Sequence, residues 1–407
     1  MDPVYELNIR HMDALLAVAR LGNISAAAVA VNLSQPALAH AMGRLERLLE
    51  ARLFDRHPAG VTPTEAGKRF CVRVERALRY LGRGARQMRR PLRMPPVPHV
   101  ERRVTMSQLR ALVAVLGSGS YAGAAEHTGL SQPTLHRAVR DLQEATEVTL
   151  LSRSGRTVGS TEAARTLAHY ARLMFAELRA AVDEIASRDD GPSGHIRIGV
   201  LPVARAQFLP RLLADFCTAH PGAAVEVIEG PYAELLARLR QGDMDLMIGS
   251  HRESVPAHDV IQTPLYEDEL VIVGHVGHPL GDKRRLTTAD LLAHPWVVPA
   301  RGVPMRLHWE RMFTGRGVEP PPLRVQCGSV LIMRGLMLEG DWVTLMSRDQ
   351  FTLESKAGQL AELGSPGPDF RRHIAMTRRI DWEPTRLQSH FVDLLKAAAS
   401  QKAAAGG

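Results

Sequence analysis

The chain contains an internal repeat near its N-terminal end. Residues 12–66 align with residues 109–163 at a constant offset of 97 positions and without a gap. Identical residues fill 21 of the 55 aligned positions, whereas ordinary amino-acid usage would give about four. The longest identical blocks pair Leu33–Pro36 with Leu130–Pro133 and Thr64–Ala66 with Thr161–Ala163. An ungapped match of this extent indicates that one structural unit has been duplicated.

Each copy carries the local signals of a winged helix-turn-helix unit. In the first copy, Asn23 caps an alanine-rich helix, and Ser34 caps the next helix with Pro36 in its first turn. Two short helices joined by a turn of about three residues form a helix-turn-helix. Residues 53–63 then suit a two-stranded wing, and Thr64 caps a long helix. The second copy repeats these signals 97 residues later.

The helix after each Ser-Gln-Pro sequence is predicted to read DNA. One stripe of this helix is apolar and faces the core, whereas the opposite stripe is polar. Glutamine can pair bidentately with adenine and arginine with guanine in the major groove, and an arginine in the wing can contact phosphate. The predicted DNA-binding residues are Ser34, Gln35, Pro36, Ala39, His40, Arg44, Arg56, Ser131, Gln132, Pro133, His136, Arg137, Arg140 and Arg153. The alternative for each copy is a solvated polar face.

The long helix of the second copy predicts a homodimer. Its apolar residues alternate spacings of four and three, which is the pattern of a coiled-coil seam. The seam residues are Leu167, Ala171, Met174, Leu178, Ala181 and Ile185.

The long helix of the first copy is expected to pair weakly. Gly82 and Gly84 each cost about 1 kcal/mol of helix propensity. Nine Lys and Arg side chains lie between Lys68 and Arg90, and we expect them to contact DNA phosphates. Four prolines between Pro91 and Pro98 end the helix and form a semi-rigid spacer.

The positive charge of the chain is concentrated in the same region. Residues 1–103 contain 18 Lys and Arg and 9 Asp and Glu, so they carry +9, whereas the other 304 residues carry −1 of the total of +8. A basic segment on a neutral body is typical of a protein that contacts a polyanion, most commonly nucleic acid.

From Gly194 onward, strands alternate with helices, which is typical of a doubly wound α/β sheet. The expected strands include His195–Val200, Ala224–Glu229, Leu246–Gly249, Glu269–Gly274, Trp296–Pro299 and Val343–Met346. The expected helices include Arg205–Ala219, Tyr232–Gln241, Thr287–Ala293, Ser329–Leu338 and Pro384–Ala399.

Composition excludes several other classes of protein. No apolar run approaches the roughly 18 residues that a membrane helix needs, and Met1–Arg10 lacks the apolar core and cleavage site of a secretory signal. The expected location is therefore the cytoplasm. Cys71, Cys217 and Cys327 stand far apart in the sequence, which predicts reduced core thiols.

Motifs for catalysis are also missing from the sequence. Ser329 follows Gly328 without a Gly-x-Ser-x-Gly elbow, and there is no glycine-rich phosphate loop. His275 and His278 lie in a stretch with glycine and proline, without a carboxylate or cysteine that completes a metal set. We expect no enzymatic activity, no cofactor and no metal.

The first copy resembles the LysR-type transcriptional regulator family. The family signature combines an alanine pair, a Ser-Gln-Pro-Ala-Leu helix start, a Leu-Phe-x-Arg wing and a Thr-Glu-Ala-Gly linker start. The matching residues are Ala27–Ala28, Ser34–Leu38, Leu53–Arg56 and Thr64–Gly67. The second copy departs from the signature at Thr134, Leu151 and Ala164. A single copy is usual in the family, so the duplication is itself a departure.

The resemblance implies a periplasmic-binding-protein-like effector domain of two lobes in the C-terminal half. Crossover strands near Leu265–Val271 and Arg371–Thr377 join the lobes, and a small-molecule effector binds between them. The implied partners are double-stranded promoter DNA, further copies of the chain in a dimer or tetramer, and RNA polymerase. The expected segments are 1–63 (first winged helix-turn-helix), 64–103 (basic linker and spacer), 104–160 (second winged helix-turn-helix), 161–190 (dimerisation helix) and 194–400 (effector domain).

Candidate effector contacts follow from sheet topology. Ligands of open α/β sheets collect beyond the carboxyl ends of strands, where helix N-termini offer free N–H groups. The positions selected by this rule are Pro202, Val203, Gly230, Pro231, Ser250, Arg252, Arg301, Gly302, Val303 and Ser329. The resulting hypothesis is a carboxylate effector with Arg252 or Arg301 as its counter-charge.

Two other interpretations remain open from the sequence. The first copy could serve as a protein-interaction module, with only the second copy reading DNA. The α/β sheet alone would also suit a solute-binding protein, although the absence of a signal sequence and the two DNA-reading units disfavour that interpretation.

Overall fold

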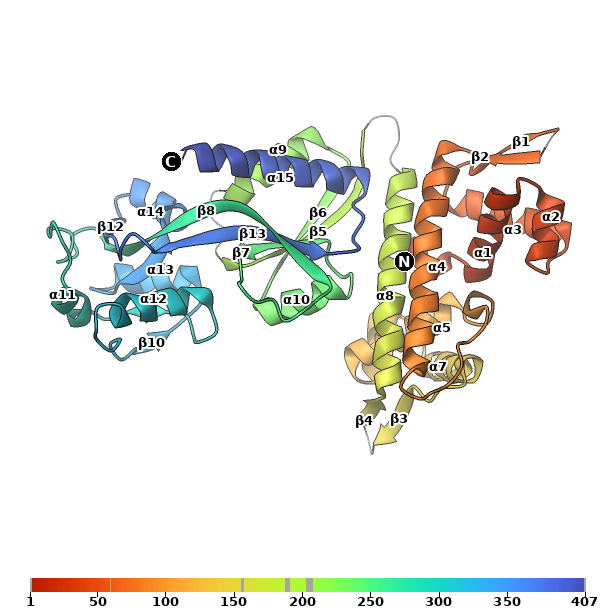
Figure 1. Ribbon diagram of the computed structural model, residues 1–407, viewed down its shortest axis with the longest axis horizontal. Helices are drawn as coiled ribbons and strands as arrows, with labels where there is room; N and C mark the ends of the chain where they lie inside the picture. The colour runs from red at the N-terminus through yellow and green to blue at the C-terminus, as the bar shows by residue number, and fades with distance from the viewer. Residues whose placement is uncertain (1, 59, 155–156, 187–190, 203–207, 406–407) are drawn as a thin grey trace.

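The computed structural model describes residues 2–58, 60–154, 157–186, 191–202 and 208–405. Figure 1 shows a helical body built from both repeats beside a two-lobed α/β domain. Two long helices, α4 (Glu65–Arg89) and α8 (Glu162–Ala186), stand at the boundary between the two bodies. This arrangement confirms the fold class predicted from the sequence.

Each repeat folds into a short 3-10 turn, three helices, a two-stranded wing and a long linker helix. Ahead of α4, the first repeat contains η1 (Pro3–Glu6), α1 (Ile9–Leu21), α2 (Ile24–Ala30), α3 (Gln35–Leu48), β1 (Phe54–His57) and β2 (Gly60–Pro63). Ahead of α8, the second repeat contains η2 (Val100–Arg102), α5 (Met106–Ser118), α6 (Tyr121–Thr128), α7 (Gln132–Thr146), β3 (Leu151–Ser154) and β4 (Thr157–Ser160). Each of these elements begins 97 residues after its counterpart, so the sequence repeat is a structural repeat.

Side-chain caps fix the helix starts at equivalent positions in the two copies. Asn23 and Ser120 each accept a hydrogen bond at 3.0 Å from the backbone N–H three residues later. Ser34 and Ser131 do the same at 3.3 Å at the starts of α3 and α7. These bonds satisfy N–H groups that a helix start leaves without a partner. The caps therefore set where each predicted DNA-reading helix begins.

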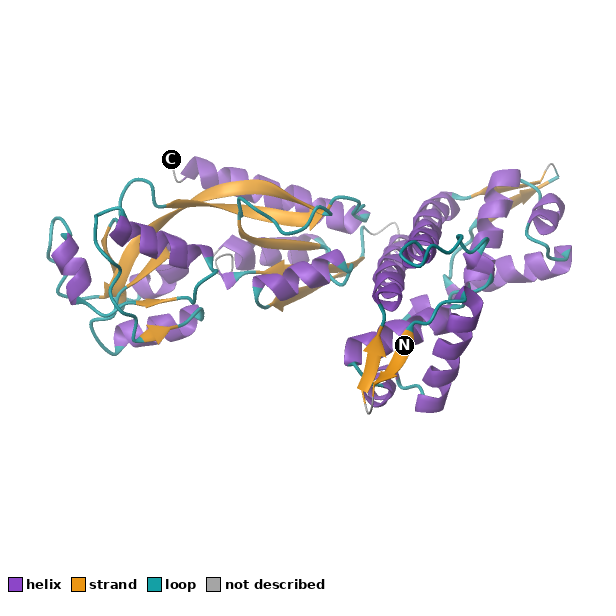
Figure 2. Cartoon of the chain, turned by 60° about the horizontal axis from the view of Figure 1, so that its bottom comes forward, coloured by secondary structure: helices purple, strands orange, loops and turns teal. Residues whose placement is uncertain are grey.

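The two linker helices pack side by side in opposite directions (Figures 1 and 2). Arg73, early in α4, bonds to Glu184 near the end of α8, whereas Gly84, late in α4, lies against Tyr170 early in α8. Their buried faces join the helices of both repeats in one hydrophobic core. The two repeats are therefore parts of a single packed body.

A mixed seven-stranded sheet organises the C-terminal domain. Its strand order is β11-β8-β13-β7-β5-β6, with β12 also paired to β8. Strand β5 runs parallel to β6 and β7, whereas β13 runs antiparallel to both β7 and β8. The strands are β5 (Gly194–Val200), β6 (Ala223–Glu229), β7 (Leu246–Ser250), β8 (Val260–His275), β11 (Thr344–Ser347), β12 (Leu360–Gly364) and β13 (Arg371–Arg379). The long strands β8 and β13 connect the lobes at the two segments where crossover strands are expected.

Helices cover both faces of this sheet in the first lobe. Helices α9 (Phe208–Ala219) and α15 (Arg386–Ala405) share one core, and α10 (Tyr232–Arg240) packs in a separate core. The second lobe contains the remaining elements around its own core. These are α11 (Thr288–Ala293), β9 (Val297–Val298), α12 (Pro304–Thr314), β10 (Val325–Gln326), α13 (Val330–Leu338), η4 (Arg348–Phe351) and α14 (Thr352–Lys356).

The cysteines are less buried than the sequence predicts. All three cysteines are free, but Cys217 is exposed and Cys71 and Cys327 are only partly buried, so the prediction of core thiols is wrong for Cys217. None of the described helices is both long enough and apolar enough to cross a membrane.

Candidate DNA-binding surface and effector cavity

Helix α3 exposes the polar stripe predicted to contact DNA. Its apolar residues Leu38, Met42 and Leu45 are buried in the core. The predicted contacts at Ser34, Gln35, Pro36, His40 and Arg44 are exposed, and Ala39 is partly buried. This half-buried helix can therefore lie against a groove with its polar face outward.

Helix α1 contributes a neutral histidine beside this surface. Burial lowers the pKa of His11, and the positive charges of Arg44 and His40 lower it further. His11 therefore stays neutral at neutral pH, and Arg44 is left as the permanent charge on this face.

Helix α7 exposes the corresponding stripe of the second copy. Ser131, Gln132, Pro133, His136, Arg137 and Arg140 are all exposed. The His136 ring stacks on Tyr121 of α6, with ring centroids 3.5 Å apart, so its orientation is held by the neighbouring helix. Arg140 lies 3.7 Å from carboxylate oxygens of Asp141 and Glu144, which partly balance its charge.

The wings lie beside these helices, as expected. Arg56 is exposed on β1, opposite Val61 of β2. The first wing is tied to α1 because Val61 N–H donates to the Gly22 carbonyl at 2.9 Å. Arg153 is on β3 opposite Val158, and its side chain lies outside the described part of the chain.

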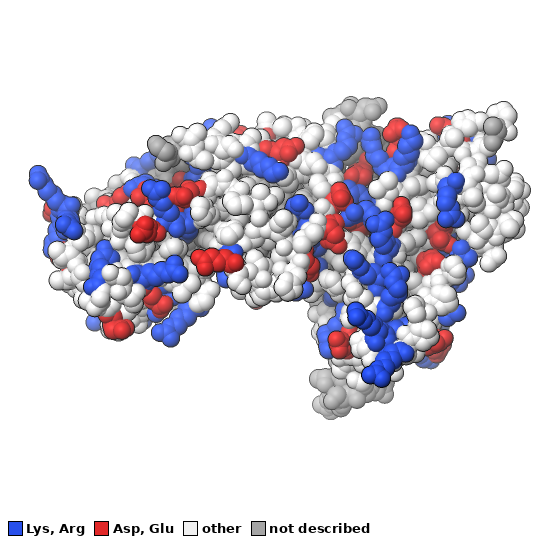
Figure 3. Space-filling model, in the orientation of Figure 1, with Lys and Arg blue, Asp and Glu red and all other residues white. Residues whose placement is uncertain are grey.

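The arginines of α4 divide into buried and exposed groups, so only the exposed group is available for the predicted phosphate contacts. Arg73 and Arg89 are buried and Arg76 is partly buried, and all three bond to protein oxygens. In Figure 3, Lys and Arg side chains form a band over α4. Its exposed arginines are Arg79, Arg83, Arg86 and Arg90.

The predicted dimer seam is filled from within the chain. Leu167, Ala171, Met174, Leu178 and Ala181 are buried, Ile185 is partly buried, and all six belong to the core shared with α4. Within this one chain α4 occupies the seam over a shared core, which differs from the expectation that α4 pairs weakly. That the seam joins two chains stays a prediction. The heptad pattern identified a helix pair, but the pattern does not specify whether the partner lies in the same chain.

A cavity of about 430 Å³ lies between the lobes of the C-terminal domain. Seven of the predicted effector positions line it: Pro202, Gly230, Pro231, Ser250, Arg252, Val303 and Ser329. Val203 lies outside the described residues. Arg301 and Gly302 do not line the cavity, because the Arg301 side chain is 86% exposed and points to Glu310 at 3.7 Å. The structure therefore gives Arg301 no place in this site.

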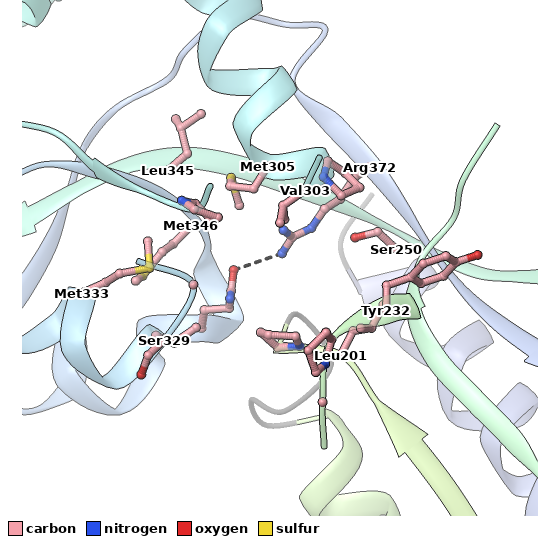
Figure 4. Close-up of a pocket in the computed structure, with 18 of the residues that line it drawn as sticks. Leu201, Tyr232, Ser250, Val303, Met305, Ser329, Met333, Leu345, Met346 and Arg372 are labelled. Atoms are coloured by element: carbon pink, nitrogen blue, oxygen red, sulfur yellow. Dashed lines mark hydrogen bonds between the residues drawn. The ribbon is translucent and has the colours of Figure 1, made fainter. Parts of the chain in front are cut away.

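The remaining lining residues were not predicted, and most are apolar. They include Leu201, Tyr232, Met305, Met333, Leu345 and Met346 (Figure 4). Methionine is unbranched and polarizable, so it adapts to an apolar ligand of irregular shape. Most of these residues lie inside helices and strands of the second lobe, and a rule based on strand ends does not reach them.

Two arginines bring positive charge to the cavity in different ways. The Arg372 side chain, on crossover strand β13, donates to Asp268 Oδ2 at 2.8 and 3.0 Å. It also donates to Gln350 Oε1 at 3.0 Å (Figure 4). Its charge is therefore balanced. The Arg252 guanidinium lies 3.7 Å above the Tyr232 ring, and among the described residues it has no ion-pair partner.

Unpaired polar groups lie beside Arg252. The Arg252 Nε and the Tyr232 hydroxyl are buried without a hydrogen-bond partner among the described residues. Burial raises the pKa of Tyr232, partly offset by Arg252, so the hydroxyl remains a donor. Buried donors without partners are costly. A ligand with acceptor atoms would satisfy them.

Helix N-termini also face the cavity. Pro231 before α10 and Val303 before α12 line the cavity and provide no side-chain cap. Ser329 caps α13 through a bond from Ile332 N–H at 3.4 Å. Uncapped N-termini leave N–H groups and positive dipole ends available to an anion.

The histidines noted in the sequence do gather in the second lobe. The His278 ring lies 5.3 Å from that of His275 and 4.6 Å from that of His294. His275 bonds to Asp341 at 3.0 Å, which raises the pKa of His275. Within the described ranges, no group of three or more His, Cys, Asp or Glu side chains has the arrangement of a metal site.

Two family descriptions match the chain. The LysR substrate binding domain matches residues 189–400. The bacterial regulatory helix-turn-helix protein of the lysR family matches twice, over residues 9–68 and 106–165. The second description therefore falls once on each repeat.

Curated relatives are regulators. The HTH-type transcriptional regulator GalR of Pseudomonas putida is 28% identical over 372 residues, covering 91% of this chain and 92% of the relative, an alignment long enough to extend into both repeats. The SDS degradation transcriptional activation protein of a Pseudomonas species is 33% identical over 260 residues, covering 63% of this chain and 84% of the relative.

Solved structures share the fold. A full-length variant of OxyR from Pseudomonas aeruginosa aligns with a TM-score of 0.55 at 18% identity, covering 72% of this chain and 93% of that one. CbnR, a LysR family transcriptional regulator, aligns with a TM-score of 0.52 at 20% identity, covering 72% of this chain and 98% of CbnR. Because the substrate-binding description spans more than half of the chain and the helix-turn-helix description matches both repeats, the chain belongs to the LysR family of DNA-binding, effector-controlled transcriptional regulators.

Proposed function

We propose that both repeats read DNA and that the interlobe cavity binds an apolar small molecule carrying an anionic group. The observation that carries the DNA-reading role is the pair of equivalent capped helices, α3 and α7, each with an exposed glutamine and arginine on its outer stripe. Gln35, Gln132, Arg44 and Arg137 supply the side chains suited to base edges. Arg56 and Arg153 supply the wing contacts to phosphate.

The cavity supports the effector class. Its wall is mostly apolar, while Arg252, the Tyr232 hydroxyl and two uncapped helix N-termini offer donors and positive charge. A molecule with an apolar body and a carboxylate or similar anion would match both the apolar wall and the positively charged donors of the cavity. This proposal keeps Arg252 as the counter-charge and omits Arg301.

The crossover strand β13 supplies a route from the cavity to the linker helices. Arg372 at its start lines the cavity, and the strand ends at Arg379, two residues before Asp381. Asp381 Oδ2 accepts a hydrogen bond at 2.7 Å from the Tyr80 hydroxyl of α4. A movement of the lobes on effector binding would therefore shift α4, and through α4 the effector would alter the contact with DNA. The chain acts without chemistry of its own, with RNA polymerase as the partner it influences.

A binding experiment tests the DNA-reading role. A duplex is selected by the full chain from a random-sequence library, and its affinity is measured by fluorescence anisotropy. Each bidentate base contact contributes about 1–3 kcal/mol, so Gln35→Ala and Gln132→Ala should each weaken binding by about 5-fold to 150-fold. Arg284→Ala, at an exposed position in the second lobe, is the control. If only Gln132→Ala weakens binding, the first repeat is an interaction module instead.

Calorimetry with paired ligands tests the effector class. Aromatic and aliphatic carboxylates are compared with their neutral amides. The wild-type chain should prefer an acid over its amide, and Arg252→Met should abolish that preference while leaving amide binding unchanged. Equal binding of acids and amides by the wild-type chain would refute the anionic effector.

A further inference from the structure

We propose that one chain carries a complete two-headed DNA-reading unit and occupies two non-identical half-sites about one helical turn apart. In this proposal α4 and α8 form an internal, pseudo-symmetric dimer. It rests on the proposed DNA-reading role of both repeats and adds how those repeats are assembled.

The linker helices are equivalent in the repeat and pair about a pseudo-two-fold axis. Each helix has 25 residues, and α8 begins 97 residues after α4. Equivalent helices packed in opposite directions are exchanged by a two-fold rotation. Gly84 lies opposite Tyr170, so in this antiparallel register Arg79 stands opposite Phe175. Positions 78 and 79 are the repeat equivalents of 175 and 176, so the axis passes near the middle of both helices.

The 3-10 turns provide independent evidence for the same symmetry. Turn η1 opens the first repeat yet packs on α5 and α8 of the second, whereas η2 opens the second repeat and packs on α1 and α4 of the first. Tyr5 of η1 meets Arg110 of α5 at 4.5 Å, and Arg102 of η2 bonds to Asp13 of α1 at 2.9 Å. Asp13 and Arg110 are 97 residues apart, so the crossed contacts occur at equivalent positions.

This pairing puts the two heads at opposite ends of the linker helices. Each winged unit is attached to the N-terminal end of its linker helix, so opposite helix directions put the wings at opposite ends of the pair (Figure 1). A helix of 25 residues is about 37 Å long. Recognition helices that enter successive major grooves are separated by about 34–36 Å. The length of the linker pair therefore matches two half-sites on one side of the duplex.

Side chains at the interface favour α4 with α8 over either helix with its own copy. A Cβ on Gly84 would lie 2.7 Å from the Tyr170 Cβ, so Tyr170 needs glycine opposite it. The residue equivalent to Gly84 in α8 is Ala181, whose Cβ would clash in a pairing of two α8 helices.

Charge favours the same combination. Arg73 of α4 is paired with Glu177 and Glu184 of α8 at 3.2 and 2.8 Å, and all three side chains are largely buried. Two α4 helices would bring Arg73 together with no carboxylate to replace those of α8. The internal pairing is therefore chemically specific.

The two heads differ where they face DNA, so the half-sites should differ too. Both begin with Ser-Gln-Pro, but Ala39, His40 and Arg44 of α3 correspond to His136, Arg137 and Asp141 of α7. Readout of base edges depends on these side chains. The expected operator is an imperfect inverted repeat with a shared glutamine contact in each half.

A short cross-linker tests whether the pairing is internal. In a chain with Cys71, Cys217 and Cys327 replaced by serine, Arg73→Cys and Glu184→Cys replace two side chains that meet at 2.8 Å across the helix contact. A short bismaleimide should give a cross-linked species with the mass of one chain that still binds the selected duplex. A product with the mass of two chains would overturn the proposal. Arg90→Cys with Glu184→Cys is the matched control, because position 90 is about 25 Å further along the helix than position 73.

A complementation experiment separates this proposal from the DNA-reading role itself. One variant carries Gln35→Ala and Arg44→Ala, and the other carries Gln132→Ala and Arg137→Ala. When the two variants are co-expressed, no complex should regain wild-type affinity for DNA. Both heads of a DNA-reading unit come from the same chain, and each variant chain has only one intact head. Recovery of wild-type affinity would mean that heads pair between chains, which would refute the internal dimer. If the unmodified chain selects no duplex at all, the proposed function fails instead.

Discussion

Replacing Arg73 by alanine should destabilise the helical body by about 3 kcal/mol, because the substitution removes the central ion pair between the linker helices. The Arg73 side chain is 6% exposed and bonds to Glu184 Oε1 at 2.8 Å and Glu177 Oε2 at 3.2 Å. It also donates to the carbonyl oxygens of Glu383 and Pro384 at 2.8 and 3.1 Å. Burial pushes the pKa of Arg73 down, but the two carboxylates outweigh it and raise that pKa, so the guanidinium stays charged.

The magnitude follows from what remains after the substitution. Breaking a buried ion pair costs about 3–5 kcal/mol because it leaves a buried charge without a partner. Glu177 keeps Arg76 at 3.0 Å, so only Glu184 is left without its cation, which places the cost near the lower limit. A body of this size loses about 2–4 °C of melting temperature for each kcal/mol. The expected loss is therefore about 6–12 °C.

Scanning calorimetry of the full chain measures this loss. Arg79→Ala is the matched control, because Arg79 is on the same helix but 65% exposed and pairs with Glu75 at 3.6 Å. Exposed pairs of this kind contribute about 0.3–0.5 kcal/mol, so the control should have nearly the same melting temperature as the wild-type chain. Arg73→Met combined with Glu184→Leu should recover most of the loss, since apolar residues can replace a buried pair. If the Arg73→Ala and Arg79→Ala variants have the same melting temperature, the specific internal pairing of α4 with α8 is refuted.

Three further predictions concern the other parts of the molecule. Burial, with a smaller contribution from Glu75, raises the pKa of the Cys71 thiol to about 11, so at pH 8 only about one Cys71 thiol in a thousand is ionised. Maleimide should therefore modify the exposed Cys217 first and spare Cys71 until the pH rises toward 11. Equal labelling rates of Cys71 and Cys217 at pH 8 would contradict this burial. Met333→Trp should fill the cavity and abolish effector binding in calorimetry while circular dichroism stays unchanged, and retained binding would place the effector elsewhere. Arg56→Ala should reduce the slope of log affinity against log salt by about 1, whereas Arg284→Ala should leave the slope unchanged; equal slopes would remove Arg56 from the phosphate contacts.

Much of this fold could be predicted because it depends on local signals. Caps such as Ser34 and Ser131 specify helix starts, and the alternation after Gly194 specifies strands and helices. The interlobe cavity lies beside loops at the carboxyl ends of strands, which is the rule that selected Pro231 and Ser250. These features are encoded within short stretches of sequence.

The features that were missed depend on contacts distant in the sequence. The α8 seam specifies an apolar partner but not that α4 of the same chain supplies it. Gly84 counts against helix formation in isolation, yet it makes room for Tyr170 in the pair. Arg73 matches its exposed neighbours in sequence and is distinguished only by Glu177 and Glu184, more than 100 residues away.

Hydroxyl-radical footprinting of the full chain on its selected duplex tests the central claim most directly. We expect two protected segments of unequal sequence, with centres about 10–10.5 base pairs apart. Gln35→Ala should weaken protection of one segment and Gln132→Ala the other. A single protected segment that responds to Gln132→Ala and ignores Gln35→Ala would contradict a chain with two DNA-reading heads.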